Sequence, residues 1–208
     1  MIRRFPRLQP LLINIRGTNG SGKSHIVFRL MEMYGSEPIK NKDGRVWAYK
    51  LNSSPSIYIL GRYETDCGGC DSIPTMDILI SMAKELGKHG GDVICEGLLM
   101  SGLVSKPIAL AAALKSHKTI FACLDTPLDI CIERTVARRK KRGTTKEFNP
   151  AHLKVKYQAV ISSRKNLESQ GYDCRTLDHK DAVSQVISWR KLHYDRFRSR
   201  FPRLRQKG

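Results

Sequence analysis

Residues Gly17-Thr-Asn-Gly-Ser-Gly-Lys-Ser24 match the pattern GxxxxGK[ST] in full, between an apolar run at 10–16 and a helical stretch that ends near Tyr34. In this context the backbone amides of a glycine-rich loop wrap phosphate oxygens, and the N-terminus of the following helix adds its positive dipole. The lysine of the pattern reaches the β- and γ-phosphates, and its serine ligates Mg²⁺. We therefore predict an ATP and Mg²⁺ site formed by Gly17, Thr18, Asn19, Gly20, Ser21, Gly22, Lys23 and Ser24.

Apolar runs alternate with helical stretches along the rest of the chain. Strands are expected at 10–16, 92–96, 118–124 and 172–178, and helices at 75–88, 98–117, 127–141, 150–169 and from 181 toward Pro202. This alternation favours an α/β fold in which helices cover both faces of a parallel sheet. We expect the helix at 98–117 to break near Pro107, and the helix at 127–141 to be opened by Asp125 or Thr126.

The chain of 208 residues is expected to form one domain. Within it, 45–51 and 56–60 flank a turn and predict a hairpin. We assign 36–74 to a hairpin insertion followed by an acceptor loop, 134–150 to a lid, and 189–208 to a basic C-terminal tail.

Positive charge is concentrated in three segments. The chain has 37 Lys and Arg against 19 Asp and Glu, and 1–10, 134–146 and 189–208 carry almost all of the net +18. Such patches favour a polyanionic partner such as nucleic acid, although a tail that only improves solubility is the alternative. In the tail, Tyr194, Phe197 and Phe201 are spaced for one helical face, so they either pack on the core or accompany nucleic-acid contacts.

The chain has no apolar run of 18 residues and no secretory signal at its start, so we expect a cytoplasmic protein. Its six cysteines fit a reducing compartment. The Cys67/Cys70 pair alone is a weak signal for a metal site.

Acidic residues near the expected strand ends supply candidates for metal binding and base catalysis. Glu96 ends the strand at 92–96 and is expected to assist Mg²⁺ beside the phosphate loop, unless it is an ordinary surface residue. In the loop at 61–74, we favour Asp71 and then Asp66 as the base that orients an acceptor hydroxyl. The alternative is ordinary turn chemistry.

Arg134 and Arg138 are four residues apart, so they lie on one face of the expected helix. Guanidinium groups placed there can stabilise charge on a transferred phosphoryl group, and a mobile lid can exclude water. The alternatives are a solvated basic face or a nucleic-acid contact unrelated to catalysis.

Four segments together resemble the bacteriophage P-loop kinases that act on 5-hydroxymethyluracil within DNA: GTNGSGKS, LGRYETDCGGCDSI, VICEGLLMSG and LDTPLDICIERTVARRKKRG. The resemblance covers 11–178 and implies a single P-loop nucleotide-kinase-like domain. It further implies ATP-dependent phosphorylation of the hydroxymethyl oxygen of DNA containing 5-hydroxymethyluracil, an early step toward hypermodified thymine. It carries the nucleotide role to Gly17–Ser24 only.

Two other functions stay open at this point. The pattern LDxP…RxxxR is also similar to adenylate and gluconate kinases, which suggests a small-molecule or nucleoside monophosphate kinase with a basic tail. A nucleotide-gated nucleic-acid-binding protein is the other.

If DNA is the substrate, the reacting hydroxymethyl group projects into the major groove. Transfer needs its oxygen within about 3–3.5 Å of the γ-phosphorus. We therefore expect the target nucleotide to be extruded, or single-stranded DNA to be the better substrate.

Overall fold

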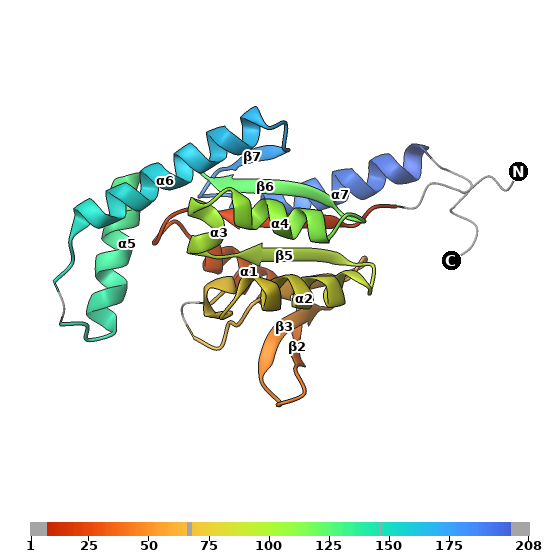
Figure 1. Cartoon of the computed structure of the whole chain (residues 1–208), viewed down its shortest axis with the longest axis horizontal. Helices are drawn as coiled ribbons and strands as arrows, with labels where there is room; N and C mark the ends of the chain where they lie inside the picture. Colours follow the sequence, from red (N-terminus) through yellow and green to blue (C-terminus); the bar gives the residue numbers. More distant parts are fainter. Residues whose placement is uncertain (1–7, 66–67, 146, 201–208) are drawn as a thin grey trace, which may run out of the picture.

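The strand that precedes the phosphate loop, β1 (Leu11–Arg16), is completely buried inside a seven-stranded sheet (Figure 1). The structure is a computed structural model that describes residues 8–65, 68–145 and 147–200. The other strands are β2 (Ser36–Lys40), β3 (Val46–Leu51), β4 (Ile57–Leu60), β5 (Asp92–Glu96), β6 (Lys118–Leu124) and β7 (Cys174–Leu177). In the order β2-β3-β4-β5-β1-β6-β7, the strands from β4 onward pair in parallel, and β3 pairs antiparallel with both β2 and β4.

Helices cover both faces of this sheet. They are α1 (Lys23–Tyr34), α2 (Met76–Gly87), α3 (Leu98–Gly102), α4 (Ser105–Ala113), α5 (Leu128–Lys141), α6 (Pro150–Ser169) and α7 (Ala182–Arg200), with a short 3₁₀ turn η1 (Cys70–Ser72). Figure 1 shows α2, α3 and α4 in front of the sheet and α1 behind it. Two apolar clusters follow from this layering, one under α1 and α7 and one under α2 and α4. The predicted α/β fold is confirmed.

Helices α5 and α6 form a hairpin that projects beyond the sheet at the left of Figure 1. The bounds of α6 agree with the prediction because Asn149 accepts the backbone N–H of Ala151 as an N-cap and Pro150 occupies the first turn. The last turn of α5 carries four basic residues.

Two helix predictions were wrong in detail. The expected break near Pro107 lies instead at 103–104, between α3 and α4. Pro107 is in the first turn of α4, where a missing backbone N–H costs nothing. The start of α5 has Pro127 at its N-cap position and no side-chain cap, because the Thr126 hydroxyl donates to the Ser21 carbonyl oxygen at 2.7 Å.

The hairpin prediction was right locally and wrong about its place in the fold. Strands β3 and β4 pair antiparallel as expected, but β4 also pairs in parallel with β5 and is therefore part of the main sheet. All four β4 residues are buried, as in a strand covered on both faces. Only β2 and β3 extend the sheet at this edge. The turn signal identified a partner close in sequence and carried no information about the distant parallel partner.

The predicted basic tail is largely a helix attached to the core. On α7, Arg190 and Tyr194 are buried, and both donate hydrogen bonds to Asp92 at the start of β5. Tyr194 therefore packs on the core, which was one of the two predicted alternatives. Phe201 and the rest of 201–208 lie outside the described residues. The same is true of 1–7. Within the described ranges, no helix combines the length and apolar character needed to span a membrane.

Candidate active site

The phosphate loop runs from β1 into α1 and packs against α5. Gly20 has φ +77°, and a Cβ there would lie 2.3 Å from the Cys131 carbonyl oxygen, so only glycine fits. The N-cap position of α1 is Gly22, which has no side chain with which to cap the helix. Gly22 therefore leaves the amides of the first turn free of its own side chain, as an anion site requires.

Lys23 lies in the first turn of α1 and is almost fully buried. Its Nζ donates to the Thr18 carbonyl oxygen at 3.0 Å, across the phosphate loop. Burial lowers the pKa of Lys23, while the negative charges of Glu96 and Asp71 oppose that shift. The ammonium group is thus held inside the loop, close to where the pattern predicts β- and γ-phosphates.

Ser24 and Glu96 meet directly, although they come from different elements. The Ser24 hydroxyl donates to Oε1 of Glu96 at 2.8 Å. Glu96 ends β5 and is 2% exposed, and this burial raises its pKa, with Lys23 and the Ser24 hydrogen bond opposing the rise. A hydroxyl and a carboxylate oxygen side by side are hard ligands of the type that Mg²⁺ prefers. The donor set therefore fits the predicted magnesium site.

The loop after β4 approaches this pair very closely. Gly69 has φ +102°, and a Cβ there would lie 2.5 Å from Oε1 of Glu96. Beside it, Tyr63 is buried, and burial together with the negative charge of Glu96 raises the pKa of the Tyr63 hydroxyl. The adjacent glycines of the CGGCD segment are thus needed for close approach. The sequence marked this loop as a turn, but it did not show what the loop packs against.

Asp71 is held at the same edge of the sheet. Its Oδ2 accepts the backbone N–H of Leu98 at 2.6 Å, and its Oδ1 accepts that of Leu99 at 3.1 Å. These two bonds fix the carboxylate against the start of α3. The other candidate base, Asp66, lies outside the described residues, as does Cys67. Cys70 is buried, and its thiol donates to the Leu60 carbonyl oxygen.

A cavity of about 400 Å³ joins the predicted residues. It is lined by the phosphate loop and by Asp71 and Glu96, with Arg134 and Arg138 contributed by α5. The donor side, the two carboxylates and the two arginines were predicted separately, and the fold brings them to one cavity.

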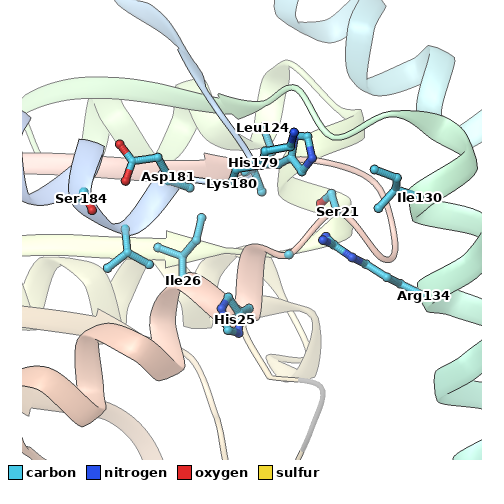
Figure 2. Close-up of a pocket in the computed structure, with 13 residues that line it drawn as sticks. Ser21, His25, Ile26, Leu124, Ile130, Arg134, His179, Lys180, Asp181 and Ser184 are labelled. Carbon is cyan, nitrogen blue, oxygen red and sulfur yellow. The ribbon is translucent and has the colours of Figure 1, made fainter.

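A second, larger cavity of about 800 Å³ adjoins the first, and Gly22, His25 and Arg134 line both. Figure 2 shows Arg134 reaching from α5 toward Ser21, and His179 above the phosphate loop. Residues 179–184, which comprise the turn after β7 and the start of α7, supply the far wall. Sequence reasoning missed this turn because it contains no motif. Its position after a parallel strand was the available signal, since ligands bind at the carboxyl ends of such strands.

Comparison with known proteins agrees with this geometry. A family model described as 5-hmdU DNA kinase matches residues 6–170. The chain belongs to the 5-hmdU DNA kinase family. It is 36% identical over 180 residues to a 5-hmdU DNA kinase of Pseudomonas phage PaMx11, covering 84% of this chain and 94% of the relative. It is 28% identical to one of Delftia phage PhiW-14, covering 86% and 71%. The resemblance inferred from the motifs is confirmed.

The fold of this 5-hmdU DNA kinase family member also occurs in a solved structure of the PezAT toxin–antitoxin system of Streptococcus pneumoniae. The TM-score is 0.51 at 15% identity, over 86% of this chain and 71% of that chain. Membership of this family makes the chain a P-loop kinase, which implies that ATP is a substrate.

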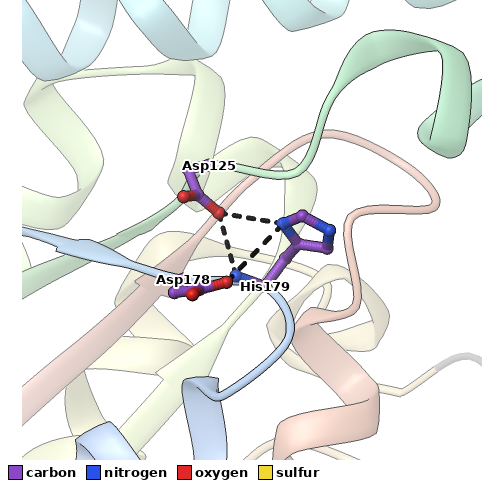
Figure 3. A group of neighbouring side chains, drawn as sticks. All are labelled: Asp125, Asp178 and His179. Atoms are coloured by element: carbon purple, nitrogen blue, oxygen red, sulfur yellow. Dashed lines mark hydrogen bonds and ion pairs between the residues drawn. The ribbon is translucent and has the colours of Figure 1, made fainter.

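In this kinase, a hydrogen-bonded group connects the turns that follow β6 and β7 (Figure 3). Oδ1 of Asp125 accepts the backbone N–H of His179 at 2.8 Å and lies 3.1 Å from its Nδ1. Asp178 accepts the backbone N–H of Lys180. Asp125, expected to open α5, therefore secures the wall of the larger cavity.

Arg16, the residue before the phosphate loop, was also missed. It is fully buried, and its guanidinium donates to the carbonyl oxygens of Met100 and Ser101, both at 2.6 Å, and to Ser163 Oγ at 2.5 Å. Gly17 in turn donates its N–H to the Ser101 hydroxyl. This network joins the start of the phosphate loop to α3 and to α6. Among the described residues, no carboxylate pairs with Arg16.

Proposed function

We propose that this chain transfers the γ-phosphoryl group of ATP to the hydroxymethyl oxygen of 5-hydroxymethyluracil in DNA, with the cavity between the phosphate loop and Asp71 as the place of transfer. The observation that supports it is that one cavity, in a member of the 5-hmdU DNA kinase family, is lined by the phosphate loop, two carboxylates and two arginines.

On the donor side, the triphosphate is bound by the amides of the phosphate loop and by Lys23. The larger cavity accommodates the nucleoside part of ATP, because it adjoins the loop and has room beyond it. Ser24 and Glu96 would hold Mg²⁺, which would supply positive charge to neutralise the phosphates of ATP.

On the acceptor side, Asp71 orients the hydroxymethyl group and takes its proton. The acceptor oxygen forms a bond to the γ-phosphorus while the bond from that phosphorus to the β,γ-bridging oxygen breaks, and ADP leaves. Each Asp71 oxygen accepts one amide hydrogen and keeps capacity for a second. Glu96 is less suited, because it is buried and already accepts the Ser24 hydroxyl.

Arg134 and Arg138 stabilise negative charge on the transferred group from the α5 side. The lid at 134–150 then consists of the second half of α5 and its connection to α6. Closure of this segment over the cavity favours transfer to the DNA hydroxyl over transfer to water.

The test uses ATP labelled in its γ-phosphate with three acceptors: DNA containing 5-hydroxymethyluracil, the same DNA with thymine, and the free 5-hydroxymethyl nucleotide. We expect label only on the modified DNA. Label on the free nucleotide alone would indicate a small-molecule kinase. Binding of ATP and DNA without transfer would indicate a nucleotide-gated binding protein. The Lys23→Ala variant is the matched negative control.

A further inference from the structure

A large apolar side chain is exposed one residue away from the lining of the acceptor side of the cavity. Helix α3 has five residues, of which Met100 and Ser101 are buried, whereas Leu99 is 52% exposed. Nothing in the catalytic arrangement above uses the Leu99 side chain. A single exposed leucine is ordinary on a protein surface, and what distinguishes Leu99 is its position beside the acceptor carboxylate of Asp71.

Leu99 is attached to the acceptor carboxylate through its own backbone. Its N–H donates to Oδ1 of Asp71 at 3.1 Å, and the preceding Leu98 lines the cavity that holds Lys23 and Glu96. The Leu99 side chain lies outside that cavity and lines a shallow hollow of about 60 Å³ together with Asp71 and Lys106. Leu98, which lines the cavity, and Leu99, whose apolar side chain is exposed, are therefore consecutive residues. The exposed Leu99 side chain is called the tip below.

A basic side chain lies beside this tip. Lys106, in the first turn of α4, lines the same hollow as Leu99. Helix α6 packs against α3, where Ser163 donates to the Leu103 carbonyl oxygen at 3.0 Å. Figure 1 shows α3 between α4 and α6. A DNA backbone phosphate bound by Lys106 would lie beside Leu99 and Asp71, which line the same hollow.

We propose that Leu99 is a wedge that enters the base stack of duplex DNA at the position vacated by the target nucleotide while that nucleotide reaches Asp71. The proposal rests on the proposed function, since it assigns a way for duplex DNA to reach that site. Extrusion unstacks and unpairs a base, and an apolar side chain inserted in the gap restores contact with the neighbouring bases. A leucine suits this role because the exposed faces of the neighbouring bases are flat and weakly polar.

The test compares Leu99→Ala with wild type and with Leu192→Ala, a control on α7 whose leucine is 53% exposed. The substrates are one 5-hydroxymethyluracil strand supplied single-stranded, in a matched duplex, and in a duplex mispaired at the target. For Leu99→Ala we expect kcat/KM to fall by about tenfold or more on the matched duplex, with recovery on the mispaired duplex, and by less than about threefold on the single strand. Leu192→Ala should behave as wild type.

A second measurement needs no phosphoryl transfer. 2-Aminopurine placed next to the target base in the matched duplex should brighten when wild type binds, and much less with Leu99→Ala at saturating protein. Leu99→Gln, of similar size but polar, should share the loss, which keeps the test available if the alanine variant does not fold.

Equal losses on single strand and duplex would overturn the proposal, because Leu99 would then only support Asp71. No loss on the duplex would overturn it as well. If wild type labels neither DNA form, the proposed function fails, and the fluorescence measurement still decides whether Leu99 opens the duplex.

Discussion

Strand β5 begins and ends with a buried carboxylate, and the two carboxylates have opposite surroundings. Asp92 at its start is 0% exposed and accepts hydrogen bonds from the Leu11 backbone, the Arg190 guanidinium and the Tyr194 hydroxyl. Glu96 at its end is 2% exposed, and in the described part of the chain it has no ion-pair partner within 4.0 Å.

The difference separates a structural acid from a functional one on the same strand. Asp92 is paired with the positive charge of Arg190 and accepts hydrogen bonds from Leu11, Arg190 and Tyr194, so it holds α7 to the sheet. Glu96 accepts the Ser24 hydroxyl and faces the phosphate loop, and burial raises its pKa. A buried carboxylate that has no ion-pair partner within 4.0 Å among the described residues, located in a cavity, is a candidate for binding a metal or substrate.

The largest effect on stability is expected from a substitution of Asp92, at the structural end of β5. Asp92→Ala leaves the Arg190 guanidinium buried without its partner, so we expect a loss of about 3–5 kcal/mol in the free energy of unfolding, measured with urea. Asp195→Ala, which removes an exposed acid on the same helix, should change it little. A loss near zero for Asp92→Ala would contradict the assignment of this end as structural.

Lys23 on α1 lies in the cavity at the functional end of β5. Lys23→Ala should lower kcat/KM by about 10²–10³-fold or more, because it removes a cation aimed at the phosphates. Its folding stability should not fall comparably, since burial disfavours the Lys23 charge in the folded protein. Kinase rates and thermal unfolding measured in parallel check both statements. Lys84→Ala on α2 is the control, and a normal rate for Lys23→Ala would refute the phosphate-loop assignment.

Asp71→Asn should lower kcat by roughly 10²-fold, as expected for loss of a general base, with little change in the KM for ATP. Glu96→Gln should instead raise the Mg²⁺ concentration needed for half-maximal rate. Rates measured as a matrix of ATP and Mg²⁺ concentrations separate the two. If Asp71→Asn shifts the Mg²⁺ requirement and Glu96→Gln does not, their roles are exchanged.

The smallest effect concerns pH. Burial raises the pKa of Glu96 above its ordinary value of 4.5, so the folded protein binds a proton there more readily than the unfolded chain. Stability from this group is therefore complete below pH 4.5 and is lost as pH rises through the folded-state pKa. Without nucleotide or Mg²⁺, wild type should lose stability relative to Glu96→Gln as pH rises through this window. A constant difference in urea denaturation would contradict the prediction.

Much of the fold could be predicted because its signals are local. The phosphate loop, the alternation of apolar runs with helices, and the Asn149 cap of α6 each depend on neighbouring residues. The place of β4 in the sheet could not be predicted in this way. It depends on pairing with β5, more than thirty residues further along the chain.

The site shows the same division. Lys23, Asp71 and Glu96 could be proposed because each follows or ends a strand in a recognisable pattern, and parallel strands bring such ends to one edge. Arg16 and the cavity wall at 179–184 could not be proposed in this way. Their contributions come from contacts with elements distant in sequence, and neither the residue type nor its neighbours indicate those contacts.

Arg16 has a consequence for how the two substrates respond to ionic strength. Burial lowers the pKa of Arg16 from its ordinary value, but a guanidinium is not deprotonated at neutral pH, so a positive charge shielded from solvent stands at the base of the phosphate loop. Mobile ions screen charges in water far better than charges in a protein core. The basic residues at the end of α5 are in contact with solvent and lose their attraction for a polyanion as salt is added. At high ionic strength the molecule should therefore release its polymer while it still retains its nucleotide.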